Sequence, residues 1–326
     1  MKTKLARMAV ALMLPVAALV TGAAHAEDFP NQTIKFVVPY AAGGLPDVMA
    51  RMVGQKVSDA TGQPVVIDNK PGASGIIAAD FVAKANPDGY TVFVGDIAQY
   101  ALNPALRQNL PYDTLRDFKP VTHAVRAPLF LMVNTSTGIK TVADFVAYAK
   151  AHPGTNYGSS GNASVHQLGM EQFAQMAGIK LTHIPYKGVA QAVPALVAGD
   201  VPVMFVSPTS AGAAGFIASG KISVLAVASP QRWPGLPAVP TMTEAGYPVE
   251  AVSNIGFLVP AKTPPAVIAR LQKELVAALK SPEIEARMPT LGAVVIASTP
   301  DEFTARIRSE QTIYAKLVKD TGVKVD

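Results

Sequence analysis

The chain has 326 residues, of which 49% are hydrophobic and 16% charged, a composition that excludes a disordered tail and suffices for two domains with cores of their own. It contains no cysteine, which excludes disulfides, thiolate metal sites, cysteine nucleophiles and a lipid-modified cysteine. We therefore expect a globular chain that is stabilised by its cores and not by covalent cross-links.

The first 26 residues have the pattern of a cleaved secretory signal peptide. Three basic residues (Lys2, Lys4 and Arg7) precede an apolar run from Met8 to Val20, and Ala24-His25-Ala26 offers the small residues that signal peptidase requires. This run is too short to span a bilayer comfortably, and no later stretch reaches the roughly 18 apolar residues that spanning requires. We therefore expect an exported protein that is free in the periplasm.

Removal of this segment also changes the charge. The formal net charge falls by three, from +5 to +2, and no run rich in Lys and Arg remains elsewhere. Because proteins that bind nucleic acid usually carry a basic patch, we expect no nucleic-acid partner.

From Ile34 onward, short β-branched runs alternate with helical patterns. The predicted strands are Ile34–Val38, Val65–Ile67 and Val92–Val94, and the predicted helices are Asp47–Ala60 and Ile76–Ala85. Gly62 ends the first helix, and the turn sequence NPDGY precedes the third strand. Repeated strand, helix, strand units imply a parallel sheet that is covered by helices.

The pattern restarts after Pro128. It predicts strands at Leu129–Val133, Leu181–Ile184, Val201–Val206 and Ile222–Ala228, and helices at Thr141–Ala151, Val189–Ala198 and Ser210–Ser219. Two further helices follow: one begins at Thr263-Pro264-Pro265 and runs through Lys280, and one begins at the capping box Thr299-Pro300-Asp301-Glu302. We predict an α/β chain of two lobes, residues 27–123 with 252–326 and residues 124–251, with a binding site between them.

Two glycine-rich segments lie where a predicted strand gives way to a helix. Gly43 and Gly44 precede a helix that begins at Pro46 or Asp47, and Gly158-Ser159-Ser160-Gly161-Asn162 precedes one that begins near Ser164. Glycine lets the chain turn sharply, and the first turn of a helix carries unpaired amides and about half a positive charge. Two such loops that face each other would bind a carboxylate without an arginine clamp.

Simpler interpretations of these residues remain open. Gly-Gly and Ser-Ser-Gly are common loop and cap sequences, and Asp47 can form an exposed i,i+4 ion pair with Arg51 instead of contacting a ligand. His166 fits a polar residue of the helix that follows the serine loop, with ligand contact as the alternative. Trp233, in a proline-rich turn, fits a packing anchor better than a stacking platform.

Known enzyme motifs are absent. A nucleophile elbow requires G-x-S-x-G, but Asn162 stands where the last glycine should be, and the dinucleotide and P-loop glycine patterns are missing. No HxH or HExxH spacing occurs among the histidines after the signal segment, which are His123, His152, His166 and His183. We expect no metal and no cofactor. A secreted hydrolase that uses Ser159 or Ser160 with His166 is the weaker alternative.

Five segments in chain order carry a family resemblance: FVVPYAAGGLPDVMAR, GQPVVIDNKPGASGIIAADFVAKANPDGYTV, YGSSGNASVHQLGMEQF, IPYKGVAQAVPALVAGDV and LPAVPTMTEAGYP. They resemble the successive motifs of the Bug receptors, the periplasmic solute-binding proteins of tripartite tricarboxylate transporters. The resemblance covers nearly the whole chain after Phe29. It implies a two-lobed Venus-flytrap receptor of the type II periplasmic-binding fold, which closes on a small organic carboxylate and delivers it to membrane transporter subunits. We expect a monomer.

The resemblance also implies binding residues. In the Bug receptors, the loop after the first strand and the serine-glycine loop of the second lobe hold one ligand carboxylate, partly through ordered waters. A Tyr-Lys-Gly loop lines the same cleft, and an aspartate that follows a first-lobe strand faces it. The residues implied here are Tyr40, Ala42, Gly43, Gly44, Leu45, Pro46, Asp47, Asp96, Ser159, Ser160, Gly161, Ser164, His166, Tyr186, Lys187 and Gly188.

Three departures from the family pattern bear on the ligand. Leu45-Pro46 lacks a hydroxyl that many relatives have, Val189-Ala190 replaces a frequent Ser-Ala, and Val206 occupies a position that is often acidic. A more apolar pocket favours an aromatic or aliphatic mono- or dicarboxylate over an amino acid, although Asp47 or Asp96 would still suit an ammonium group. A receptor that presents its ligand to a sensor kinase is the alternative role.

Overall fold

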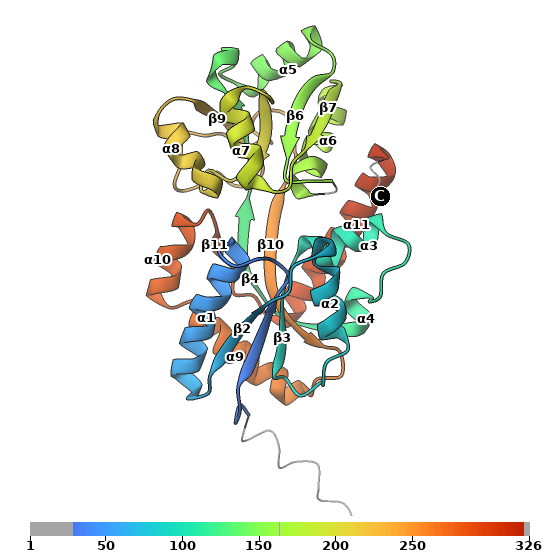
Figure 1. Cartoon of the computed structure of the whole chain (residues 1–326), viewed down its shortest axis with the longest axis vertical. Helices are drawn as coiled ribbons and strands as arrows, with labels where there is room; N and C mark the ends of the chain where they lie inside the picture. Colours follow the sequence, from blue (N-terminus) through green and yellow to red (C-terminus); the bar gives the residue numbers. More distant parts are fainter. Residues whose placement is uncertain (1–28, 163, 323–326) are drawn as a thin grey trace, which may run out of the picture.

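The computed structural model describes residues 29–162 and 164–322, which are drawn in colour in Figure 1. The predicted signal segment, residues 1–26, lies outside this part of the chain. The described residues form two lobes, each built on its own β-sheet with helices on both faces (Figure 1). The predicted two-lobed α/β architecture is therefore confirmed.

Lobe 1 contains a six-stranded sheet in the order β11-β4-β10-β3-β1-β2. Its strands are β1 (Ile34–Val38), β2 (Val65–Asn69), β3 (Thr91–Asp96), β4 (Phe118–Pro128), β10 (Val252–Pro260) and β11 (Val294–Val295). Its helices are α1 (Leu45–Thr61), α2 (Ile76–Ala83), α3 (Asn103–Leu106), α4 (Thr114–Asp117), α9 (Pro265–Leu279), α10 (Pro282–Thr290) and α11 (Pro300–Thr321). Alternate residues of a strand face opposite sides, so Phe36 packs in one core and Val37 in the other.

Lobe 2 contains a five-stranded sheet in the order β7-β6-β8-β5-β9. Its strands are β5 (Phe130–Asn134), β6 (Thr155–Ser159), β7 (Leu181–Pro185), β8 (Val203–Val206) and β9 (Ile222–Val227), and its helices are α5 (Val142–Ala151), α6 (Val165–Ala177), α7 (Val189–Ala198) and α8 (Ala213–Ala218). Trp233 is buried edge-on against Phe130, so it is a packing anchor.

Two antiparallel strands connect the lobes. The chain leaves lobe 1 through β4 and continues almost directly into β5, and β10 brings it back, pairing with β4 from Val252–Pro128 to Pro260–Phe118. In Figure 1 these strands run along the middle of the molecule. The predicted lobe boundary between residues 123 and 124 falls inside β4, whereas that between 251 and 252 meets the start of β10.

The prediction of a parallel sheet holds only on one side of each sheet, β3-β1-β2 in lobe 1 and β7-β6-β8 in lobe 2. β1 pairs in parallel with β2 and β3, and β6 with β7 and β8, as strand–helix–strand units require. The pairs made by β10, β11 and β5 are antiparallel. β5 and β10 follow the crossings between the lobes, whereas the short strand β11 follows α10 and pairs with β4 at the edge of the sheet.

One predicted helix also needs correction. The segment Ser210–Ser219 is not continuous, since a 3-10 turn over Ser210–Gly212 precedes α8. The break occurs because Ala211 and Gly212 both adopt left-handed backbone angles, with φ of 50° and 76°.

The lobes also touch through helices. Leu168 of α6 is fully buried in a cluster of lobe 1 residues that includes Tyr100, Phe303 and Ile307. Two of these residues belong to α11, which therefore packs against both the lobe 1 sheet and a lobe 2 helix. Within the described part of the chain, none of the helices combines the length and apolar character needed to cross a membrane.

Candidate functional site

The two glycine-rich segments lie at the facing ends of the two lobes. Figure 1 shows the segment between β1 and α1 on the side of lobe 1 that faces lobe 2, and the segment between β6 and α6 on the opposing side of lobe 2. We call them the lobe 1 loop (residues 39–44) and the lobe 2 loop (residues 160–162 and 164). Each follows the carboxyl end of a parallel strand and ends at the amino terminus of a helix.

Asp47 fixes the lobe 1 loop from the first turn of α1. Arg51 donates two hydrogen bonds to its carboxylate, Nε to Oδ2 at 3.0 Å and Nη2 to Oδ1 at 2.9 Å. The Gly43 amide donates to Oδ2 at 2.9 Å, and Asn69 Nδ2 donates to Oδ1 at 3.0 Å and to the Tyr40 carbonyl at 3.0 Å. Both carboxylate oxygens are therefore occupied within lobe 1.

The predicted ion pair between Asp47 and Arg51 is present, but only Arg51 is exposed, whereas Asp47 is buried. Asp47 is only 2% exposed, because the loop folds over it. Burial acts to raise the pKa of Asp47, but the hydrogen bonds from Arg51, Gly43 and Asn69 outweigh burial and hold this pKa below its usual value. Asp47 is thus an ionised group that holds the loop in place.

Asp96 ends β3 in a second polar cluster beneath the lobe 1 loop. Tyr40 donates its hydroxyl to Asp96 Oδ2 at 2.7 Å, and the Ala98 amide donates to Oδ1 at 2.8 Å. Gln99 Nε2 in turn donates to the Tyr40 hydroxyl at 3.1 Å. Burial raises the pKa of Asp96 to about 6, although the bonds from Tyr40 and Ala98 act in the opposite direction.

The lobe 2 loop is held by Ser159, a fully buried residue at the end of β6. Its hydroxyl donates to the Gly161 carbonyl at 2.9 Å and accepts from the Gly161 amide at 3.1 Å. His183 Nε2 lies 2.6 Å from the same oxygen. With three partners inside lobe 2, the Ser159 hydroxyl is fully used, and its role is structural.

Ser160 and Ser164 lie nearer the surface of the lobe 2 loop. The Ser160 hydroxyl lies 2.8 Å from His166 Nδ1. The helix begins near Ser164, as predicted, and Ser164 is its N-cap: its hydroxyl accepts from the Gln167 amide at 3.3 Å and donates to the Gly161 carbonyl at 2.8 Å. Burial lowers the pKa of His166 to about 4, so this imidazole is neutral at neutral pH.

The Tyr-Lys-Gly segment adjoins the lobe 2 loop. The Tyr186 amide donates to the Ser159 carbonyl at 3.1 Å, which joins the ends of β6 and β7. Gly188 has a φ of 112° and is the N-cap of α7, and the Lys187 side chain is exposed. Residues 40–47 and 158–164 contain neither Lys nor Arg. Among the three segments that the resemblance implies in binding, Lys187 therefore supplies the one Lys or Arg side chain.

The amides that remain available differ from those that the glycine pattern suggested. The Gly43 and Gly161 amides are bonded to Asp47 and Ser159. In the described chain, the amide of Gly44 has no acceptor; Ala42 and Gly44 are exposed, and Leu45 and Pro46 are half-buried. On lobe 2, the amides of Val165 and His166 occupy the first turn of α6, where helix geometry provides no partner.

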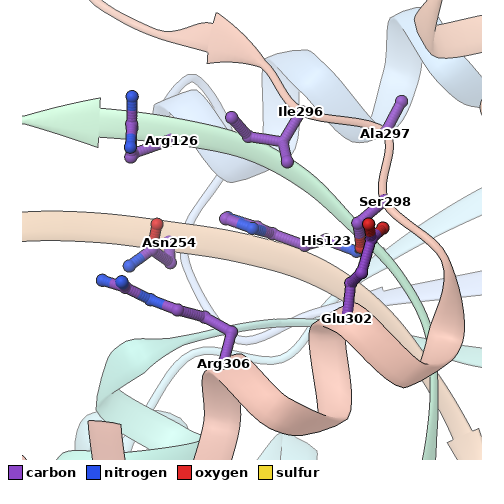
Figure 2. Close-up of a pocket in the computed structure, with 8 residues that line it drawn as sticks. All are labelled: His123, Arg126, Asn254, Ile296, Ala297, Ser298, Glu302 and Arg306. Carbon is purple, nitrogen blue, oxygen red and sulfur yellow. The ribbon is translucent and has the colours of Figure 1, made fainter. Parts of the chain in front are cut away.

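A separate pocket of about 430 Å³ lies between the crossing strands, the segment 296–298 and the first turns of α11 (Figure 2). It is lined by His123 and Arg126 of β4, Asn254 of β10, Glu302 and Arg306 of α11, and the segment 296–298. None of the residues implied by the family resemblance lines it. Across residues 29–162 and 164–322, no three His, Asp or Glu side chains are grouped so that they could hold a metal ion.

Two facing lobes, crossing strands and a helix amino terminus on each side define the class of two-lobed solute-binding receptors. Comparison with known proteins identifies the family. Residues 49–323 match the model of the tripartite tricarboxylate transporter family receptor, and the chain belongs to that family. This confirms the resemblance to the Bug receptors.

Individual relatives agree with this assignment. The chain is 34% identical to protein BugT of Bordetella pertussis over 304 residues, which is 92% of each chain. Among solved structures, it is similar to R. palustris Rpa4515 with adipate, at 33% identity and a TM-score of 0.82 over 91% of this chain and 99% of the other. It is also similar to MatC of Rhodopseudomonas palustris with bound malate, at 30% identity and a TM-score of 0.77 over 89% and 100%.

Proposed function

We propose that this protein is a monomeric periplasmic receptor that binds a small organic carboxylate between its lobes and delivers it to the membrane subunits of a tripartite transporter. The observation that carries this proposal is the pair of helix amino termini, α1 and α6, at the facing ends of the lobes. Such termini bind anions through unpaired amides and the helix dipole.

The strength of such a site is sufficient without a fixed cation. Charge-assisted hydrogen bonds contribute roughly 1.5 to 3 kcal/mol each. Three or four of them, from amides near Gly44 and Val165 and from the Ser160 hydroxyl, approach the roughly 8 kcal/mol of micromolar affinity after ordering costs. Arg51, one turn beyond Asp47 on α1, is already paired with Asp47.

The ligand class follows from charge. Asp47 accepts four hydrogen bonds within lobe 1 and so has no acceptor site left for an ammonium group, and Asp96 is buried and already bonded to Tyr40 and Ala98. We therefore favour an aliphatic or aromatic mono- or dicarboxylate over an amino acid. The adipate and malate of the two similar structures are dicarboxylates, which makes them the first compounds to test.

A thermal-shift screen of organic acids tests the proposal. A ligand at about a hundredfold excess over its Kd stabilises the folded state by about 2.7 kcal/mol. We expect adipate, malate or an aromatic acid such as phthalate to raise the Tm, with titration calorimetry giving the Kd. A panel without any stabilising carboxylate would refute the receptor function. Micromolar binding of aspartate or glutamate alone would refute the ligand preference.

We further propose that the protein is not a hydrolase, although Ser160 is hydrogen-bonded to His166. A serine nucleophile needs a histidine base that is itself oriented by a third group, usually a carboxylate. Among the described residues, no carboxylate is bonded to His166. Labelling with a serine-reactive phosphonate tests this directly: modification of Ser160 would contradict the proposal.

A further inference from the structure

We propose that His183 is the positioning residue of the lobe 2 loop: it fixes Ser159, which in turn fixes the turn at Gly161 that presents the α6 amides. This inference rests on the proposed carboxylate site but concerns a residue that neither the sequence patterns nor the family resemblance singled out. His183 does not belong to either loop. It lies on β7, in parallel register with Tyr157 of β6.

The contacts of His183 hold its ring in one orientation. The ring stacks on Tyr157, with the centroids 5.0 Å apart and the planes inclined by 26°. Tyr157 is itself immobilised, because it is fully buried and its hydroxyl donates to Glu171 of α6 at 2.5 Å. The stack leaves Nε2 directed at the Ser159 oxygen, 2.6 Å away.

The hydrogen-bond inventory of Ser159 determines which atom donates. A hydroxyl has one proton, and Ser159 is placed to give it to the Gly161 carbonyl while its oxygen accepts from the Gly161 amide. The remaining lone pair accepts from His183, so Nε2 carries the ring proton. Burial lowers the pKa of His183, which favours this neutral form and adds no positive charge beside the loop.

The consequence for the loop is mechanical. Gly161 has a φ of 132°, which other residues adopt only with strain, and its carbonyl also accepts from the Ser164 N-cap. Ser159 therefore bonds both the amide and the carbonyl of Gly161, in the turn that precedes α6. Without His183, Ser159 loses one of its partners inside the buried end of β6, and the loop samples other conformations before ligand arrives.

Two substitutions separate the hydrogen bond from the ring stack. His183→Phe keeps an aromatic ring on Tyr157 but cannot donate to Ser159. His183→Gln gives up the stack but places its Nε2 at a similar reach from the backbone. We expect Phe to weaken adipate and malate binding about tenfold, as the loss of one buried hydrogen bond implies, and Gln to stay within about threefold of the parent protein.

A ligand-free measurement keeps this test independent of the proposed function. Hydrogen exchange of the segment 157–168, with the segment 142–151 of α5 as the internal reference, reports loop opening directly. We expect about tenfold faster exchange in His183→Phe and near-parent exchange in His183→Gln. If the parent protein binds no carboxylate but this pattern holds, the proposed function fails and the positioning role stands.

The double variant with Ser159→Ala tests whether His183 acts through Ser159. Once Ser159→Ala has removed the shared partner, His183→Phe should add less than about twofold to the exchange rate or to the Kd. Additive effects, or parent-like exchange in His183→Phe, would overturn the proposal. If His183→Phe does not fold, Ser159→Ala alone decides, since parent-like exchange in that variant would equally overturn it.

Discussion

The two loops have the same place in their lobes but are fixed by different chemistry. The lobe 1 loop is held by an ionised carboxylate: Asp47 accepts from Gly43, and Arg51 and Asn69 complete its shell. The lobe 2 loop is held by neutral groups, since Ser159 takes both the amide and the carbonyl of Gly161. In each lobe, a glycine amide that an anion could use is consumed by an internal bond.

This difference teaches how an anion site can be built without a fixed cation. Arg51, which follows the lobe 1 loop on α1, is neutralised by Asp47, and the His166 imidazole on lobe 2 is neutral because burial lowers its pKa. In the site that we propose, the amides left over, around Gly44 and at the start of α6, are the groups that would distinguish a carboxylate from a neutral solute.

The largest effect is expected where charge holds the loop. Asp47→Ala removes the acceptor of Arg51, Gly43 and Asn69 together, so we expect a free energy of unfolding lower by about 3 kcal/mol and loss of carboxylate binding. Urea denaturation and calorimetry measure the two effects. Asp59→Ala, an exposed position on the same helix, serves as the matched control and should change stability by less than about 0.5 kcal/mol.

A second test uses the pH dependence of lobe 1. The folded pKa of Asp96, about 6, exceeds its unfolded value near 3.8, so its contribution to stability is complete below the unfolded pKa and is lost as the pH rises through about 6. Relative to the parent protein, Asp96→Asn should therefore gain about 2 kcal/mol between pH 4 and pH 6. Urea melts across this range measure the difference, and parallel curves for the two proteins would contradict the assignment.

The two serines of lobe 2 offer a smaller and sharper contrast. Ser159 is buried and fully bonded, so Ser159→Ala should lower the free energy of unfolding by about 1 to 2 kcal/mol. Ser160→Ala should leave stability nearly unchanged and weaken carboxylate binding by about three- to tenfold, because Ser160 is only half-buried and its hydroxyl has one partner, His166 Nδ1. Equal loss of stability in both variants would mean that the lobe 2 loop is held differently from the way described.

The smallest effect is expected at Lys187. Its side chain is exposed, so salt screens the attraction between its charge and a carboxylate. Lys187→Gln should therefore raise the Kd by less than about threefold, with most of the change at low ionic strength. Calorimetry at two salt concentrations checks this. A hundredfold loss would show that lobe 2 relies on a fixed cation after all.

Much of the fold was predictable because its signals are local. The strand Ile34–Val38, the helix start near Ser164 and the capping box at Thr299 all lie where the sequence predicts them. The crossing strand β4 was not predicted, because its sequence FKPVTHAVRAP has two prolines and no alternation of apolar and polar residues. Its strand conformation depends on pairing with β10, more than 120 residues later.

The candidate site divides in the same way. The sequence reveals both loops, because glycine before a helix is a local pattern. It does not reveal that Asp47 and Ser159 accept hydrogen bonds from the amides of Gly43 and Gly161. The role of His183 depends on the register of β6 and β7, which brings it opposite Tyr157 from 26 residues away. Only the alternation of LTHIP could have hinted at it, by placing His183 on the same strand face as Leu181. The paired state of Asp47 was foreseen through Arg51, but its burial required the folded loop.

The contact of Leu168 with α11 has a mechanical consequence for ligand capture. A contact that persists while two bodies rotate must lie close to their axis, and Leu168 is only one helical turn from Val165. The start of α6 would then travel a short arc on closure, and β7 at the sheet edge a longer one. Removing this contact, for example with Leu168→Ala, would make the relative orientation of the lobes less constrained and would leave the amides proposed to bind the anion unchanged.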